Sequence, residues 1–246
     1  MSTNSGSTSA AARCVVAVDG PSGSGKSTVS RRVAQRLGLR YLDTGAMYRA
    51  ITWEVLRRQL ELEPALLGLV LTADELDRME LEVGTDPRRA AVRIAGHDVA
   101  TAIRGEEVTS AVSIVSAVPQ VRRWLVTRQR ELIGAGRIVV EGRDIGTTVV
   151  PTAEVKVFLT ASGSARAARR HREAVEDGAV ERTEAALARR DALDSTRATS
   201  PLARAADAVE IDSTDLGVAE VVSAVLARCA AAGLTGAAGP SPGRGL

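Results

Sequence analysis

One stretch of the chain decides the fold: Gly20-Pro21-Ser22-Gly23-Ser24-Gly25-Lys26-Ser27, followed by Thr28. It matches the pattern G-x-x-x-x-G-K-[ST], whose glycines let backbone N–H groups surround a phosphate. An apolar run at residues 14–18 precedes it, and apolar residues at helical spacing follow it up to Gly38. Strand, glycine-rich loop and helix in this order predict a phosphate-binding loop (the P-loop).

The chemistry of the P-loop residues predicts how ATP would bind. The side chain of Lys26 is a compact positive charge suited to the β- and γ-phosphates, and the hydroxyl of Ser27 is suited to Mg²⁺. The chain has only two lysines, Lys26 and Lys156. We therefore expect residues 20–28 to bind ATP, with Mg²⁺ as cofactor and Ser27 as its ligand.

The rest of the chain alternates between strand and helix patterns. Short apolar runs at residues 138–140, 155–159 and 208–211 are typical of strands buried on both faces of a parallel sheet. Helical patterns separate them, which predicts an α/β fold with helices on both faces. The predicted helices cover residues 47–60, 106–117, 119–134, 163–176, 182–192 and 217–231. A small inserted antiparallel sheet is predicted from strand-like pieces at residues 79–83, 91–94 and 97–100.

Composition excludes several classes of partner. The net charge is +2 and aromatic residues make up 2% of the chain, so we expect no nucleic-acid partner. Apolar runs fall short of the roughly 20 residues that a membrane span requires, so we expect no membrane partner. The first 12 residues lack the features of a signal peptide, and the distant Cys14 and Cys229 are interpreted as reduced thiols. These features predict a cytoplasmic protein.

A P-loop alone is also compatible with GTPases and ATPases. The base-recognition motif N-K-x-D of GTPases is absent from the sequence. A motor-type ATPase has an acid at a strand end, a part that Glu141 could play, but Gly142-Arg143-Asp144 follows it and favours another class. A P-loop nucleotide switch without catalytic activity stays open as an alternative.

Several polar clusters predict a second anionic nucleotide beside the P-loop. They are residues 43–49, Ser113 with Arg122, residues 141–144 at a strand's carboxyl end, and residues 189–197. A further set of arginines predicts a lid that closes over the transferred phosphate and excludes water: Arg166, Arg169, Arg170, Arg172, Arg182, Arg189 and Arg190. We expect Trp53, Trp124 and Tyr41 to pack in the core.

Together these motifs resemble the long form of the bacterial cytidylate kinases, from about residue 15 to residue 226. The distinctive pieces are residues 20–28, 42–49, 102–104 with 107–108, 119–122, 141–147 and 211–214. The resemblance implies a three-layer P-loop fold with a five-stranded parallel sheet. It also implies a core (residues 13–46, 119–160 and 198–232), a nucleoside-monophosphate arm that holds the small sheet (47–118), a short helical lid (161–197) and disordered tails (1–12 and 233–246).

The resemblance also implies roles for individual residues. Thr44, where the family often has serine, would surround the cytosine together with Arg122 and Asp144. Ser113, Arg190 and Asp194 would contact the ribose, and Arg49, Arg143 and Arg197 would hold the α-phosphate. The catalytic residues would be Lys26, Arg143, Arg190 and Arg197. The implied activity is phosphoryl transfer from ATP to CMP or dCMP by a monomer, and the nearest alternatives are uridylate/cytidylate, adenylate or shikimate-type kinases.

Overall fold

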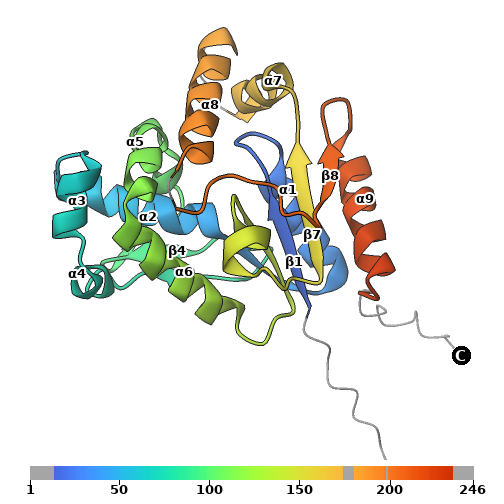
Figure 1. The fold of residues 1–246 in the computed structure, drawn as a ribbon, viewed down its shortest axis with the longest axis horizontal. Coiled ribbons are helices and arrows are strands. Elements are labelled where there is room, and N and C mark those ends of the chain that lie inside the picture. Colours follow the sequence, from blue (N-terminus) through green and yellow to red (C-terminus); the bar gives the residue numbers. More distant parts are fainter. Residues whose placement is uncertain (1–13, 174–179, 198, 235–246) are drawn as a thin grey trace, which may run out of the picture.

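The computed structural model describes residues 14–173, 180–197 and 199–234 (Figure 1). Its main sheet has five parallel strands in the order β2-β6-β1-β7-β8. The strands are β1 (Val15–Asp19), β2 (Arg40–Asp43), β6 (Ile138–Gly142), β7 (Val155–Thr160) and β8 (Val209–Asp212). Because all five run parallel, their carboxyl ends lie along one edge of the sheet, where ligands bind in α/β folds.

Helices cover both faces of this sheet. Val15 and Ala17 of β1 pack into the apolar core on one face, and Val16 and Val18 pack into the core on the other. One core includes α2 (Thr44–Arg57), α5 (Glu106–Ala117) and α6 (Pro119–Ile133), and the other includes α1 (Lys26–Leu37) and α9 (Val218–Ala231). The two cores explain why the strand sequence is apolar without alternation. The predicted three-layer α/β fold with a five-stranded parallel sheet is confirmed.

Sequence patterns did not identify β2 or the true start of α2. β2 has only four residues with half-buried polar ends, and its pairing with β6, which places Tyr41 opposite Val139, makes it a strand. The helix predicted at residues 47–60 begins at Thr44, because the Asp43 side chain caps it by accepting the Ala46 N–H at 2.9 Å. β2 therefore delivers Asp43 and Thr44 to the carboxyl edge of the sheet.

The small antiparallel sheet is present, with shorter strands than predicted. Its strands are β3 (Glu82–Val83), β4 (Val92–Ile94) and β5 (His97–Asp98). The expected strand at residues 79–83 is wrong in its first half, since Glu80 has φ of 47° and turns the chain. Two helices and one 3-10 turn of this region were not predicted: α3 (Pro64–Val70), α4 (Ala73–Asp77) and η1 (Ala102–Arg104).

Two further helices, α7 (Gly163–Glu173) and α8 (Val180–Ser195), lie above the carboxyl edge of the sheet (Figure 1). The helix predicted at 182–192 is longer at both ends, and the last residues of the one predicted at 163–176 lie outside the described residues. A π-helical turn, η2 (Ile145–Val149), follows β6. Within the described residues, no helix is long and apolar enough to cross a membrane. The division into core, arm and lid stays a prediction, and the predicted tails lie almost wholly outside the described residues.

Candidate active site

The P-loop occupies the turn between β1 and α1. Gly20 has φ of 146°, and a Cβ at this position would lie 2.1 Å from the carbonyl oxygen of Leu159 in β7. Gly23 and Gly25 have φ of 77° and 90°, a region that side-chain-bearing residues rarely adopt. Because α1 begins at Lys26, the loop's N–H groups and the positive end of the helix face the same space.

Lys26 is buried inside this loop. Its Nζ donates to the carbonyl oxygen of Pro21 at 2.6 Å. Burial, followed by the charge of Arg143, holds the pKa of Lys26 well below its usual range. An anion bound in the loop would offset both effects, so the site is arranged to receive phosphate.

Residues of α7 and α8 contact the P-loop from above. The main chain of Ser22 donates to Asp191 (3.1 Å) and accepts from Arg166 (3.0 Å), and Arg166 also forms an ion pair with Asp191. Arg190 reaches the Ser22 hydroxyl at 3.4 Å. Among the other arginines of the predicted lid, Arg169 donates to the hydroxyl of Ser213. Arg172 bonds to a carbonyl oxygen of its own helix and Arg189 is exposed. The side chain of Arg182 lies outside the described residues.

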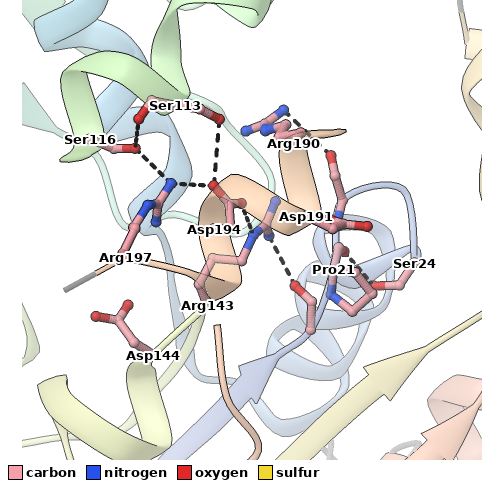
Figure 2. Close-up of polar contacts among 12 residues, drawn as sticks. Pro21, Ser24, Ser113, Ser116, Arg143, Asp144, Arg190, Asp191, Asp194 and Arg197 are labelled. Carbon is pink, nitrogen blue, oxygen red and sulfur yellow. Dashed lines mark hydrogen bonds and ion pairs between the residues drawn. The ribbon is translucent and has the colours of Figure 1, made fainter. Parts of the chain in front are cut away.

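Asp194 of α8 is the centre of a second cluster (Figure 2). Its carboxylate accepts from Arg143 Nε at 2.9 Å, forms an ion pair with Arg197, and lies 3.5 Å from the hydroxyl of Ser113. Burial by itself would raise the pKa of Asp194, but Arg143 and Arg197 outweigh it and hold the pKa below its ordinary value. Arg143 also donates to the carbonyl oxygen of Gly20 at 3.0 Å, so this cluster directly adjoins the P-loop.

The same region contains more positive charge than Asp194 neutralises. Burial and the neighbouring charges of Arg143 and Arg49 lower the pKa of Arg190 to about 9. Burial and the charge of Arg170 lower the pKa of Arg49 to about 10. The guanidinium of Arg49 also donates to the Thr109 hydroxyl at 2.8 Å. We call Arg49, Arg143, Arg190, Asp194 and Arg197 the anion-binding cluster. Its surplus of half-buried cations fits a phosphate group.

A separate pair of charges lies at the end of β6 beside this cluster. Arg122 of α6 donates to Asp144 at 2.7 Å, and both side chains are less than 10% exposed. We call these two residues the base-reading pair. Asp144 does not pair with its chain neighbour Arg143, whose guanidinium bonds to Asp194 instead. Thr44 lies close by, since its hydroxyl donates to the carbonyl oxygen of Glu141 at 2.7 Å.

Glu141 and Ser27 supply oxygen atoms beside the P-loop that fit a magnesium site. Oε1 of Glu141 accepts from the Tyr41 hydroxyl at 2.5 Å, whereas its buried Oε2 has no hydrogen-bond partner among the described residues. Burial and the charge of Asp43 raise the pKa of Glu141 to about 7, while Lys26 and the hydrogen bond from Tyr41 lower it. Hard oxygen donors of this kind are the ligands that Mg²⁺ prefers. Tyr41, predicted as a core residue only, therefore also has a polar contact in the site.

The structure brings all the predicted site residues to the carboxyl edge of the sheet and adds others. Sequence reasoning missed Ser116, whose hydroxyl accepts from Arg197 at 2.8 Å, and Thr109 beside Arg49. It also missed Asp19, which accepts backbone N–H groups from the turn after Asp144. A carboxylate immediately before the P-loop, at the end of an apolar strand, was the one signal available for Asp19.

Fold and site together define an α/β P-loop kinase: a P-loop adjoins a second, cationic cluster at the carboxyl ends of parallel strands. The family model described as "Cytidylate kinase" matches residues 16–231. The chain therefore belongs to the cytidylate kinase family, an enzyme family of phosphotransferases, which confirms the resemblance and the class of function predicted from the sequence.

Individual relatives agree with this assignment. The chain is 54% identical over 213 residues to a cytidylate kinase of Nocardia farcinica, covering 85% of this chain and 90% of that protein. It is 52% identical over 219 residues to a cytidylate kinase of Rhodococcus jostii, covering 87% and 93%. A crystal structure of a Thermus thermophilus protein is 17% identical, with a TM-score of 0.45 and coverage of 92% and 100%, a likeness too low to add to the assignment.

Proposed function

We propose that this protein transfers the γ-phosphate of ATP to CMP or dCMP, giving ADP and CDP or dCDP, as a cytoplasmic monomer of pyrimidine nucleotide metabolism. The observation that carries the proposal is that three groups of residues lie next to one another at the carboxyl edge of the sheet. The P-loop is next to the anion-binding cluster through the Arg143–Gly20 contact, and Asp144 of the base-reading pair follows Arg143 directly in the chain. A triphosphate, a monophosphate and a base each have a matching chemical environment.

The base-reading pair favours cytosine by its hydrogen-bonding capacity. Cytosine presents an amino donor at N4 beside an acceptor at N3, whereas uracil presents an acceptor at O4 beside a donor at N3. A carboxylate only accepts and a guanidinium only donates. Asp144 facing N4 and Arg122 facing N3 would match cytosine and leave both groups mismatched against uracil. Thr44 would complete the base site, and Ser113, Asp194 and Arg190 would contact the ribose.

The reaction needs alignment and charge stabilisation but no general base. Arg49, Arg143 and Arg197 would hold the phosphate of CMP so that one of its oxygens attacks the γ-phosphorus in line with the bond to ADP. The new P–O bond forms as the bond between the γ-phosphorus and the β–γ bridging oxygen breaks, and ADP leaves with that electron pair. The attacking oxygen is already ionised at neutral pH. Lys26, Arg190 and the three arginines that hold the CMP phosphate would stabilise the negative charge that develops on the transferred phosphoryl group and on ADP.

Magnesium fits beside the P-loop at the Ser27 hydroxyl, close to the free oxygen of Glu141. When bound, Mg²⁺ neutralises the charge of the ATP phosphates and orients them. Ser27 would be its protein ligand.

A coupled ADP-release assay tests the proposal. Purified protein is given ATP and Mg²⁺ with CMP, dCMP, UMP, AMP or shikimate in turn, and CMP or dCMP is expected to give the highest kcat/KM. A preference for UMP or AMP would instead assign another small-molecule kinase. Nucleotide binding without turnover of any acceptor would indicate a P-loop switch.

A further inference from the structure

We propose that Asp19 is a positioning residue for base selection: it holds the turn that carries Asp144, and thereby sets where the base-reading pair lies relative to the P-loop. Asp19 touches no substrate in this proposal and acts through Asp144. The inference rests on the proposed function, because it concerns how the same site distinguishes cytosine from uracil.

The hydrogen bonds of Asp19 give the first evidence. Its carboxylate ends β1 and is only 5% exposed. One oxygen accepts the N–H of Ile145 at 2.8 Å and the other accepts the N–H of Gly146 at 2.8 Å. These are the two residues directly after Asp144. The carboxylate therefore fixes two successive peptide groups next to the base-reading pair.

The residue after Asp19 holds the other side of the same turn. The carbonyl oxygen of Gly20, the first residue of the P-loop, accepts from Arg143 at 3.0 Å. The last residue of β1 and the first residue of the P-loop thus bind the residues after and before Asp144. A displacement at this junction would move Asp144 away from Arg122 of α6, which is held separately by its bond to the carbonyl oxygen of Ser116 in α5.

Packing leaves the turn little room to move on its own. Ile145 is completely buried, and a Cβ added to Gly146 would lie 3.2 Å from Cδ of Lys156 and 3.4 Å from the Asp19 carboxylate. A larger residue at position 146 would therefore press on both neighbours. The turn and Asp19 fit together as one packed unit, so changing either side is expected to shift Asp144.

The pKa of Asp19 is consistent with a carboxylate that holds backbone N–H groups. Burial raises the pKa of Asp19 to about 6, although the two N–H groups and Lys26 lower it. The nearby charge of Asp144 acts in the same direction as burial. A buried carboxylate beside another acid would be costly unless it is well hydrogen-bonded, and the bonds that this structure gives Asp19 go to the turn.

Asp19→Asn tests the proposal. The amide keeps one acceptor and turns an NH₂ group toward the second backbone N–H, so one bond is replaced by an unfavourable donor–donor contact. We expect kcat/KM for CMP to fall about tenfold or more while the weaker UMP reaction changes much less, so the CMP/UMP ratio falls about tenfold. The ratio of equilibrium affinities for CMP and UMP without ATP is expected to fall as well.

Asp98→Asn is the matched control. Asp98 is an exposed carboxylate of the arm that accepts the Ala100 N–H at 3.1 Å, and its replacement is expected to leave the CMP/UMP ratio unchanged. Gly146→Ala provides the second variant. Its Cβ would lie 3.2 Å from Cδ of Lys156 and 3.4 Å from the Asp19 carboxylate, contacts that a small shift relieves, so we expect the variant to fold and to lower the ratio in the same direction.

The outcomes separate the two proposals. If the CMP and UMP reactions of both Asp19→Asn and Gly146→Ala fall together and the ratio holds, Asp19 has only a structural role and the inference is wrong. If Asp19→Asn does not fold, the ratio in Gly146→Ala decides. If the wild-type protein does not phosphorylate CMP, the proposed function itself fails, independently of either variant.

Discussion

Two groups of arginines and carboxylates lie side by side in this protein and differ in charge balance. The base-reading pair matches one cation, Arg122, with one anion, Asp144, at 2.7 Å. The anion-binding cluster places one anion, Asp194, among several arginines, three of which have lowered pKa values. A balanced pair suits an uncharged base, whereas an unbalanced cluster is stabilised when an anion binds. The difference indicates which half of a nucleotide each group would receive.

Removing the anion of the base-reading pair is expected to have the largest effect. Asp144→Ala leaves Arg122 buried without its partner and removes the acceptor for the N4 amino group. We expect selectivity for CMP over UMP to fall by up to about 10⁴-fold, since a site that leaves polar groups unpaired discriminates on that scale. Steady-state kinetics with both nucleotides measure it. Asp86→Ala, in an exposed turn, is the control, and equal losses with CMP and UMP would contradict base reading.

Removing the P-loop cation should lower the turnover of CMP and of UMP by the same factor. Lys26→Ala is expected to lower kcat by at least about 10²-fold, because losing one charge aimed at the transition state costs about 3–4 kcal/mol. The CMP/UMP ratio should hold, unlike in Asp144→Ala. Arg36→Ala, an exposed cation on the same helix, is the control. A variant that keeps more than about a tenth of wild-type turnover would show that the loop does not contact the transferred phosphate.

A cation of the anion-binding cluster is expected to contribute less. Arg190→Gln removes one of several arginines near the phosphates, so kcat/KM should fall about 10- to 100-fold, the scale of a hydrogen bond to a charged group. The loss should be similar for CMP and UMP. A changed ratio would mean that the cluster also reads the base, and the distinction between the two groups would be lost.

The smallest expected effect concerns the one anion of the cluster. The pKa of Asp194 lies below 3.8 in the folded protein, so the folded state binds fewer protons than the unfolded chain. The stability that this lowered pKa contributes is present above the ordinary pKa of an aspartate and is lost as the pH falls through the folded value. Asp194→Asn should therefore be less stable than wild type at pH 7, with the difference narrowing toward pH 3. Urea unfolding at several pH values measures this, and a constant difference would contradict it.

Prediction from the sequence succeeded where a local signal was strong. The P-loop was identified by its glycines and by Lys26, and most strands and helices by apolar runs and periodicity. Prediction failed for β2, because this segment becomes a strand only by pairing with β6. That pairing places Tyr41 opposite Val139. It also failed at Asp19, since a single acid at a strand end has no local pattern that reveals its partners 126 and 127 residues away.

The sequence by itself therefore determined the fold class, the P-loop and the family, because these depend on residue type and spacing along the chain. Only the tertiary structure decided which charges meet. Arg143 and Asp144 are neighbours in the chain, yet Arg143 pairs with Asp194 of α8 and Asp144 pairs with Arg122 of α6. The physical reason is that the turn after β6 directs consecutive side chains to different elements, and the packing of helices over the sheet edge brings distant partners to each of them.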